Sequence, residues 1–169
     1  NPHSCSLCLT SSDSPFYRDK FREYHQCENC NLIFVPNIFF LNAEDEKAEY
    51  DLHENDPTDL RYRRFLERLF IPLKQRLSPG SFGSVPGPTL SLMLEEEGHT
   101  MALFDPFYAA DQKVLNTQYD FITTTEVVEH FHHPRNSFSQ MLSCLKVDVL
   151  LGIMTKISTG IENFPNWHY

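Results

Sequence analysis

The first four cysteines of the chain form two pairs whose spacing is typical of a metal site. Two residues separate Cys5 from Cys8, and the pair Cys27 and Cys30 repeats that spacing after a gap of eighteen residues. A two-residue spacer lets both thiolates of a pair face one point, so two pairs can surround a zinc ion as a tetrahedron. Two disulfides or free thiols are the alternatives, and His25 is an alternative ligand. Four thiolates would leave zinc no open position, which predicts a structural role.

A second group of chemically capable side chains follows a buried-looking strand at 121–124. Glu126, Glu129 and His130 come after that strand, and Pro134 then begins an expected helix. An open α/β sheet binds ligands at the carboxyl ends of its strands, where such side chains would lie. Because histidine titrates near neutral pH, His130 could serve as a general base, with Glu129 beside it. The alternative is that both residues only cap or pack the next helix.

A glycine-containing segment, Ser81–Pro88, precedes another expected helix. A glycine turn at a helix start lets the backbone approach a ligand and points free N–H groups at it. Asp105 follows a predicted strand and lies 22 residues after Gly83. An acid about 20 residues beyond such a turn accepts hydrogen bonds from ribose hydroxyls. A turn or cap role before Pro106 is the alternative for Asp105.

The spacing of apolar residues predicts the helices and strands that must position these side chains. Apolar residues recur at helical spacing from Leu60 to Leu77, after an Asp-Pro-Thr-Asp start, and Pro72 is expected to kink that helix. Alternating helices and strands favour an open α/β sheet. The predicted elements are short hairpin strands within residues 16–35, helices at 43–50, 60–77, 89–97 and 134–146, and strands at 100–104, 113–116 (a remnant), 121–124 and 147–154.

Three regions follow from this pattern. Residues 1–36 are expected to form a zinc ribbon, residues 37–78 a linker with a helical segment, and residues 79–169 the sheet domain. A ribbon of about thirty residues has too small a core to fold alone, so the metal must supply its folding energy.

The charge balance limits the partners. The chain has 14 lysines and arginines against 23 acids, a net charge of −9, which argues against binding along nucleic-acid phosphates. The arginines between 61 and 68 are interpreted as a solvated helix face. No apolar run approaches the length of a membrane span, and no signal peptide is evident. We therefore expect a cytoplasmic protein, where disulfides are disfavoured, and we interpret Cys144 as a core residue.

The segment Tyr119–Pro134, YDFITTTEVVEHFHHP, resembles the fourth-strand motif of class I S-adenosylmethionine (SAM) methyltransferases, (Y/F)D-x-I-x-x-x-E-V-x-E-H-x-x-x-P. The segment 81–88 resembles the glycine turn of that family, although Val85 replaces the second glycine and the strand expected before Gly83 is missing. Residues 163–169 resemble the F-x-N-W-x-Y segment of zinc-ribbon methyltransferases, which continues into further strands.

The resemblance implies a Rossmann-like parallel sheet, incomplete at its carboxyl end, with SAM as cofactor. It implies a small-molecule methyl acceptor such as a sugar, because family members with this architecture act on such molecules. It also offers divalent-metal binding as another use of Glu129 and His130. An RNA base methyltransferase with a zinc module and a non-catalytic binding module are the competing hypotheses; the oligomeric state is not indicated. The cofactor contacts it implies are Gly83, Ser84, Gly87, Asp105, Pro106, Thr125 and Glu126.

Overall fold

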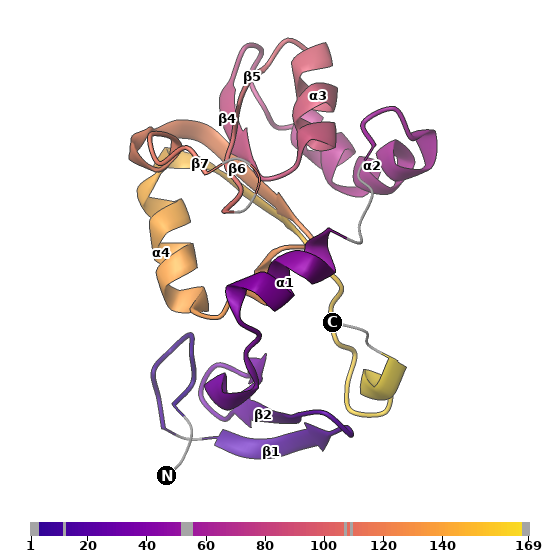
Figure 1. The fold of residues 1–169 in the computed structure, drawn as a ribbon. Helices are drawn as coiled ribbons and strands as arrows, with labels where there is room; N and C mark the ends of the chain where they lie inside the picture. Colours follow the sequence, from indigo (N-terminus) through magenta and orange to yellow (C-terminus); the bar gives the residue numbers. More distant parts are fainter. Residues whose placement is uncertain (1–3, 12, 52–55, 107, 109, 167–169) are drawn as a thin grey trace.

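The computed structural model of the protein describes residues 4–11, 13–51, 56–106, 108 and 110–166. Figure 1 shows a small group of strands at the amino end and a sheet flanked by helices, with α1 between them. The predicted fold class is confirmed, since a parallel α/β sheet and four neighbouring cysteines are both present. No helix among the described residues is long and apolar enough to cross a membrane.

The amino-terminal ribbon has three antiparallel strands, β1 (Asp13–Arg18), β2 (Glu23–Cys27) and β3 (Ile33–Phe34). Its buried centre consists of little more than Cys5, Cys27 and Phe34. Such a core is too small to offset the chain entropy lost on folding. The ribbon therefore has the small core expected from its sequence, and a core of this size would need a bound metal to stay folded.

The helices begin where local signals predict. The side chain of Asn42 caps α1 and that of Asp59 caps α2, whereas a proline in the first turn begins α3 and α4. Pro72 lies inside α2, which continues past it and ends three residues earlier than predicted. The helices are α1 (Ala43–Tyr50), α2 (Leu60–Lys74), α3 (Pro88–Glu96) and α4 (Pro134–Ser143), with single 3-10 turns at η1 (Asn37–Phe39), η2 (Val114–Asn116), η3 (Val128–His130) and η4 (Phe164–Asn166).

The main sheet is parallel, with the strand order β5-β4-β6-β7. The chain runs outward from β4 to β5 and then crosses back to β6 on the other side of β4. A reversal of this kind creates a crevice at the carboxyl ends of the two central strands, where open α/β sheets bind ligands. The strands are β4 (Phe82–Val85), β5 (Thr100–Leu103), β6 (Tyr119–Thr125) and β7 (Leu145–Met154).

The first strand of the main sheet, β4, is present but short, and it contains Gly83 rather than ending before it. Gly83 lies opposite Met101 of β5 and Phe121 of β6. The ring of Phe121 covers Gly83 so closely that a Cβ atom there would overlap it. Gly83 is therefore a packing glycine within a strand, and the connecting turn begins only after Val85. The strand was missed because a short Phe-Gly-Ser-Val segment lacks the apolar run that marks a buried strand.

The predicted strand remnant at 113–116 was wrong. Residues 114–116 form the 3-10 turn η2, because consecutive backbone N–H groups bond to carbonyls three residues earlier. Strand β7 begins at Leu145, two residues before the prediction, and α4 correspondingly ends at Ser143. The resemblance noted at residues 163–169 lies partly outside the described residues.

Alternate residues of β6 face two different cores. Phe121 packs with α2 and α3 on one face of the sheet. Ile122 packs with Met141 of α4 and Val114 of η2 on the other. Figure 1 shows this arrangement, with α2 and α3 on one side of the strands and α4 on the opposite side.

Asp120 joins the beginnings of three strands. Its carboxylate accepts a hydrogen bond of 2.8 Å from the backbone N–H of Phe82 and one of 2.7 Å from Lys146 Nζ. Lys146 and, after it, that N–H group hold the pKa of Asp120 below its ordinary value. Asp120, the aspartate of the motif segment that begins at Tyr119, therefore helps to hold β4, β6 and β7 together.

Candidate functional site

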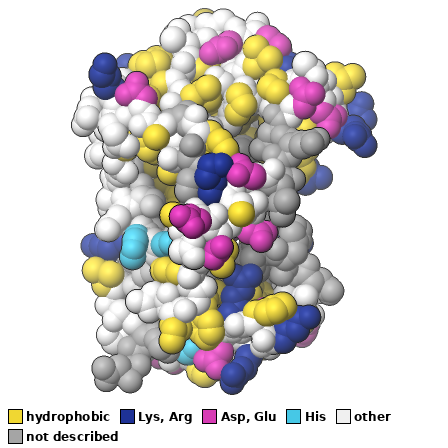
Figure 2. Space-filling view, in the orientation of Figure 1, with side chains coloured by type: hydrophobic (Ala, Val, Ile, Leu, Met, Phe, Trp, Pro, Cys, Tyr) yellow, Lys and Arg dark blue, Asp and Glu magenta, His cyan; other side chains and the backbone are white. Residues whose placement is uncertain are grey.

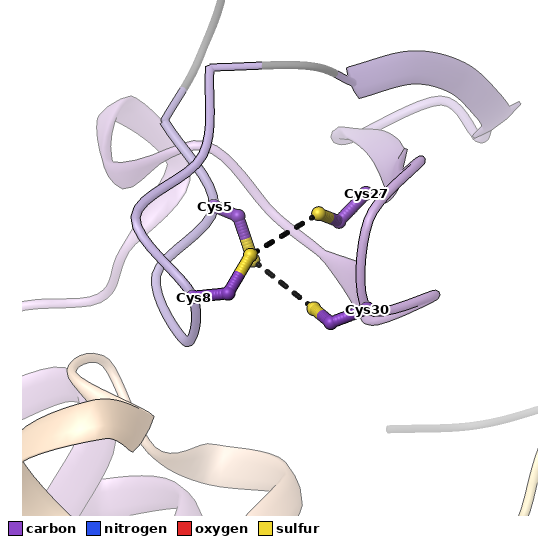
Figure 3. A group of neighbouring side chains, drawn as sticks. All are labelled: Cys5, Cys8, Cys27 and Cys30. Atoms are coloured by element: carbon purple, nitrogen blue, oxygen red, sulfur yellow. Dashed lines mark hydrogen bonds between the residues drawn. The ribbon is translucent and has the colours of Figure 1, made fainter.

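The four predicted zinc ligands lie together, although they come from two separate loops. Their sulfur atoms all lie within 4.8 Å of one another (Figure 3). The Sγ atoms of Cys5 and Cys30 are 3.6 Å apart, and those of Cys8 and Cys27 are 3.5 Å apart. Four sulfurs at about 2.3 Å from a zinc ion would stand about 3.8 Å from one another. The donor set and its spacing therefore fit a tetrahedral zinc ion.

The surroundings of the cluster agree with this use. The hydroxyl of Thr10 lies 3.4 Å from the sulfur of Cys8, and this hydrogen bond is the largest of the contacts that lower the pKa of Cys8 to about 5. Burial instead raises the pKa of Cys30 to about 12, so zinc would have to displace a proton there. His25 is not part of the cluster, because its Nδ1 bonds to Asp13 Oδ2 at 2.5 Å.

A cavity of about 420 Å³ lies on the α4 face of the sheet, at the switch point between β4 and β6. This volume falls in the range of small-molecule sites. Most of its wall is apolar, and its polar groups stand near the carboxyl ends of the strands. The lining residues from the strands and their ends are Ser84, Val85, Pro86, Phe104, Asp105, Pro106, Tyr119, Ile122, Thr123 and Thr124.

One buried hydroxyl group on the cavity side of β6 has no partner among the described residues: Thr124 Oγ1 makes no hydrogen bond to any of them. Thr123 Oγ1 is also buried without such a bond, but the Thr123 side chain lies on the opposite face, near Leu69 and Leu73 of α2. Buried polar atoms in folded proteins almost always have a partner. A ligand with its own polar groups would supply one, so the cavity fits a molecule that combines an apolar ring with hydroxyl or amine groups.

The structure brings together only part of the predicted cofactor set. Ser84, Asp105 and Pro106 line the cavity, and the Asp105 carboxylate also accepts a hydrogen bond of 3.0 Å from the backbone N–H of Tyr108. Gly87 caps the start of α3 and does not line the cavity. Gly83, Thr125 and Glu126 are likewise absent from its wall.

Sequence reasoning missed the opposite wall of the cavity. It is formed by η2 and its flanks, by the segment after β6, and by the inner side of α4, including Cys144. Helical spacing in α4 could have shown which residues face the sheet, but no motif marks the rest. These residues are Gln112, Val114, Leu115, Val127, Phe131, Ser137, Gln140, Met141 and Cys144.

The predicted catalytic pair lies beside this cavity. Glu126 has a positive φ of 54°, and its backbone N–H donates to the Met154 carbonyl at 2.8 Å. Glu129 and His130 form the turn η3 just after Val127, which does line the cavity. Both carboxylate oxygens of Glu129 are buried without a hydrogen bond to another described residue. We call residues 126 to 130 the acidic rim; they adjoin the cavity through Val127, whereas Glu126, Glu129 and His130 do not line it.

The acids of this rim hold protons more tightly than ordinary glutamates. Burial raises the pKa of Glu129, although the backbone N–H of Glu129 itself and, after it, the nearby Thr155 hydroxyl oppose the shift. Burial also raises the pKa of Glu126, and repulsion from Glu129 adds to it. A carboxyl whose pKa is shifted toward neutrality suits general acid or base chemistry.

We expect Glu129→Gln to stabilise the fold above the ordinary pKa of glutamate, by about 1 kcal/mol. Folded protein keeps the Glu129 proton to higher pH than unfolded protein does. The stability of the natural chain therefore falls as pH rises from the unfolded pKa through the folded one. Urea unfolding at pH 5 and pH 8 would measure this, with Glu67→Gln on an exposed position of α2 as control. A glutamine variant that is less stable at pH 8 would show that a partner holds Glu129 ionised.

The parallel sheet and its switch point define a Rossmann-like protein with a cavity at the carboxyl edge. Residues 52–169 match the family described as a methyltransferase domain, and the chain belongs to that family. No curated protein matches the chain. The family resemblance read from the sequence is thereby confirmed for the methyltransferase part, whereas the ribbon at 5–30 lies outside the matched residues.

Proposed function

We propose that the protein is a SAM-dependent methyltransferase that acts on a small molecule. The observation that carries this proposal is the cavity at the switch point, which has Asp105 just after β5 and, near the end of β6, a Thr124 hydroxyl without a hydrogen-bond partner among the described residues. Membership of the methyltransferase-domain family supplies the reaction class. SAM, when bound, provides an activated methyl group on sulfur.

The residues that line the cavity divide into two roles in this proposal. Asp105 accepts hydrogen bonds from ribose hydroxyls, while Thr124 supplies a hydroxyl partner deeper in the site. Phe104, Leu115 and Met141 provide apolar surface for a base ring. The contribution of the protein to rate is then mainly orientation, because placing two reactants correctly can replace much of the entropic cost of their encounter.

The acidic rim would receive the acceptor. Glu129, whose pKa burial raises, takes the proton that the acceptor loses, and His130 in the same turn is the second candidate for that base. Glu126 adjoins Glu129 and completes the polar edge. A small acceptor is favoured over a nucleic acid because the chain carries a net charge of −9. Zinc in the ribbon has a structural role, since four thiolates fill its coordination shell.

We expect Asp105→Ala to weaken binding of S-adenosylhomocysteine by about 10- to 100-fold, the scale of leaving ribose hydroxyls unmatched. Isothermal titration calorimetry would measure the change, and thermal unfolding would check that the variant remains folded. Glu67→Ala removes an exposed acid from α2 and should leave the affinity unchanged. If Asp105→Ala binds as tightly as the natural chain, Asp105 does not hold the ribose.

A further inference from the structure

A second cavity, of about 410 Å³, lies where the ribbon meets α4. Residues of the first cysteine loop form one wall, and residues around η1 form another. The third wall is the beginning of α4 and the two histidines before it. The lining residues are Ser4, Cys5, Ser6, Leu9, Phe34, Val35, Pro36, Asn37, Phe40, His132, His133, Arg135 and Asn136. We call this the junction cavity.

The junction cavity differs in charge from the rest of the molecule. None of its described lining residues is acidic, although the chain has 23 acids. Figure 2 shows histidine side chains and a basic side chain near the lower end of α4, whereas acidic side chains gather near the centre of the same view. The nearby acid is Glu46 of α1, whose Oε2 lies 3.8 Å from His132 Nε2 and which does not line the cavity. Among the described lining residues Arg135 carries a positive charge, so an anion would bind beside Arg135 and away from the Cys5 thiolate of the zinc cluster.

Arg135 is fixed at the mouth of the junction cavity. Its Nη1 donates to the carbonyl of Leu7 at 3.2 Å, and its backbone N–H donates to Ser6 at 3.4 Å. That side-chain bond uses one of the five N–H donors of a guanidinium group. The remaining donors form the planar fork that recognises carboxylate and phosphate oxygens.

Aromatic side chains also line the junction cavity. The rings of Phe40 and His132 stack with centroids 4.4 Å apart and planes inclined by 16°. The rings of Phe40 and His133 are T-shaped, with centroids 6.5 Å apart, and the buried ring of Phe34 also lines the cavity. Flat aromatic surface beside a cationic fork suits a ligand with a ring and an anionic group.

We propose that the junction cavity binds a small molecule in which an oxyanion, either a phosphate monoester or a carboxylate, is joined to an apolar ring. The oxyanion pairs with Arg135, and the ring packs against Phe34 and Phe40. This site is separate from the cavity at the switch point, although the same chain segment borders both. Phe131 and Ser137 line the switch-point cavity, while His132 and Arg135 line the junction cavity. Binding here needs no cofactor, so the proposal stands independently of methyl transfer.

The test is calorimetric titration of the full zinc-loaded chain with phenyl phosphate, phenylacetate and inorganic phosphate. We expect saturable binding of at least one ring-bearing anion, weakened at least about tenfold in Arg135→Ala. Because Arg135 also anchors the ribbon, a second variant, Asn37→Phe, fills the cavity while leaving Arg135 in place and should also abolish binding. Arg61→Ala, which removes an exposed arginine from α2, is the matched control.

The two aromatic probes differ in their oxyanion. Tighter binding of phenyl phosphate would indicate a phosphate ligand, and tighter binding of phenylacetate would indicate a carboxylate ligand. Inorganic phosphate that binds as tightly as phenyl phosphate would overturn the role of the ring. Absence of binding by both aromatic probes, or binding unaffected by Arg135→Ala and Asn37→Phe, would overturn the site itself. S-adenosylhomocysteine titrated into the same samples reports on the switch-point cavity separately, so failure of one proposal is distinguishable from failure of the other.

Discussion

Replacing Cys27 with serine should release zinc and unfold the ribbon. Cys27 is fully buried, and its sulfur lies 3.5 Å from that of Cys8 within the four-sulfur cluster. Binding of structural zinc contributes on the order of 10–16 kcal/mol in small zinc modules, far more than the ribbon core can supply. Metal analysis would give the zinc content, and hydrogen exchange of β1 and β2 would report the loss of structure.

Cys144→Ser is the matched control for this experiment. Cys144 is buried outside the cluster, and its thiol donates to the carbonyl of Leu115 at 3.1 Å, a bond that a serine hydroxyl can keep. This variant should retain its zinc and a protected ribbon. One zinc ion per chain in Cys27→Ser, with β1 and β2 still protected, would contradict the four-thiolate assignment.

The loss of zinc should also loosen the contact between the ribbon and the carboxyl-terminal turn. Phe164 is buried, and its ring packs edge-on against Phe16, Tyr17 and Tyr24 of the ribbon strands. These contacts depend on strands that the zinc holds together. The segment around η4 should therefore lose protection together with the ribbon.

The second large effect is expected at Phe121, in the middle of β6. Its side chain is fully buried and joins the core formed with α2 and α3. Phe121→Ala should destabilise the fold by about 3–5 kcal/mol, because removing a buried ring loses transfer energy and leaves a cavity. Urea unfolding would measure this loss. Phe21→Ala makes the same change at a side chain that is 74% exposed, and should alter stability by no more than about 0.5 kcal/mol.

A double-mutant cycle with Gly83 tests the packing itself. In the natural chain Gly83→Ala should be destabilising, since the three atoms nearest to the added methyl group all belong to the Phe121 ring. With Phe121→Ala already present, the same methyl group would enter the space that the ring vacates and should cost less or stabilise. Additive effects of the two changes would show that Gly83 is not kept small by Phe121.

The sequence was most informative where chemistry depends on neighbours along the chain. The clustering of the four cysteines could be predicted from spacing, since each pair is fixed by two intervening residues and only one long-range approach is needed. The start of α2 followed from the Asp-Pro-Thr-Asp segment, and the parallel sheet followed from alternation together with the segment at 119–134. Local rules and the final fold agree at these positions.

Features that depend on contacts between distant segments could not be predicted from neighbours along the chain. Gly83 resembled a turn glycine, but the ring of Phe121, 38 residues later, decides that it lies within a strand. Gln112 and Leu115 reach the cavity through the 3-10 turn η2, whose sequence resembles a short strand. The sequence placed Glu126, Glu129 and His130 after β6, but the burial of Glu129 depends on the packing of distant segments.

The most direct test of the account is calorimetric titration of the zinc-loaded chain with S-adenosylhomocysteine, repeated on Ile122→Trp. Ile122 lines the switch-point cavity from the middle of β6, so a larger side chain there would fill the space proposed for the cofactor. The account predicts saturable binding of one molecule per chain in the micromolar range, and loss of that binding in a folded Ile122→Trp protein. Absence of binding by the folded natural chain, or equal binding by both proteins, would contradict the proposed cofactor site.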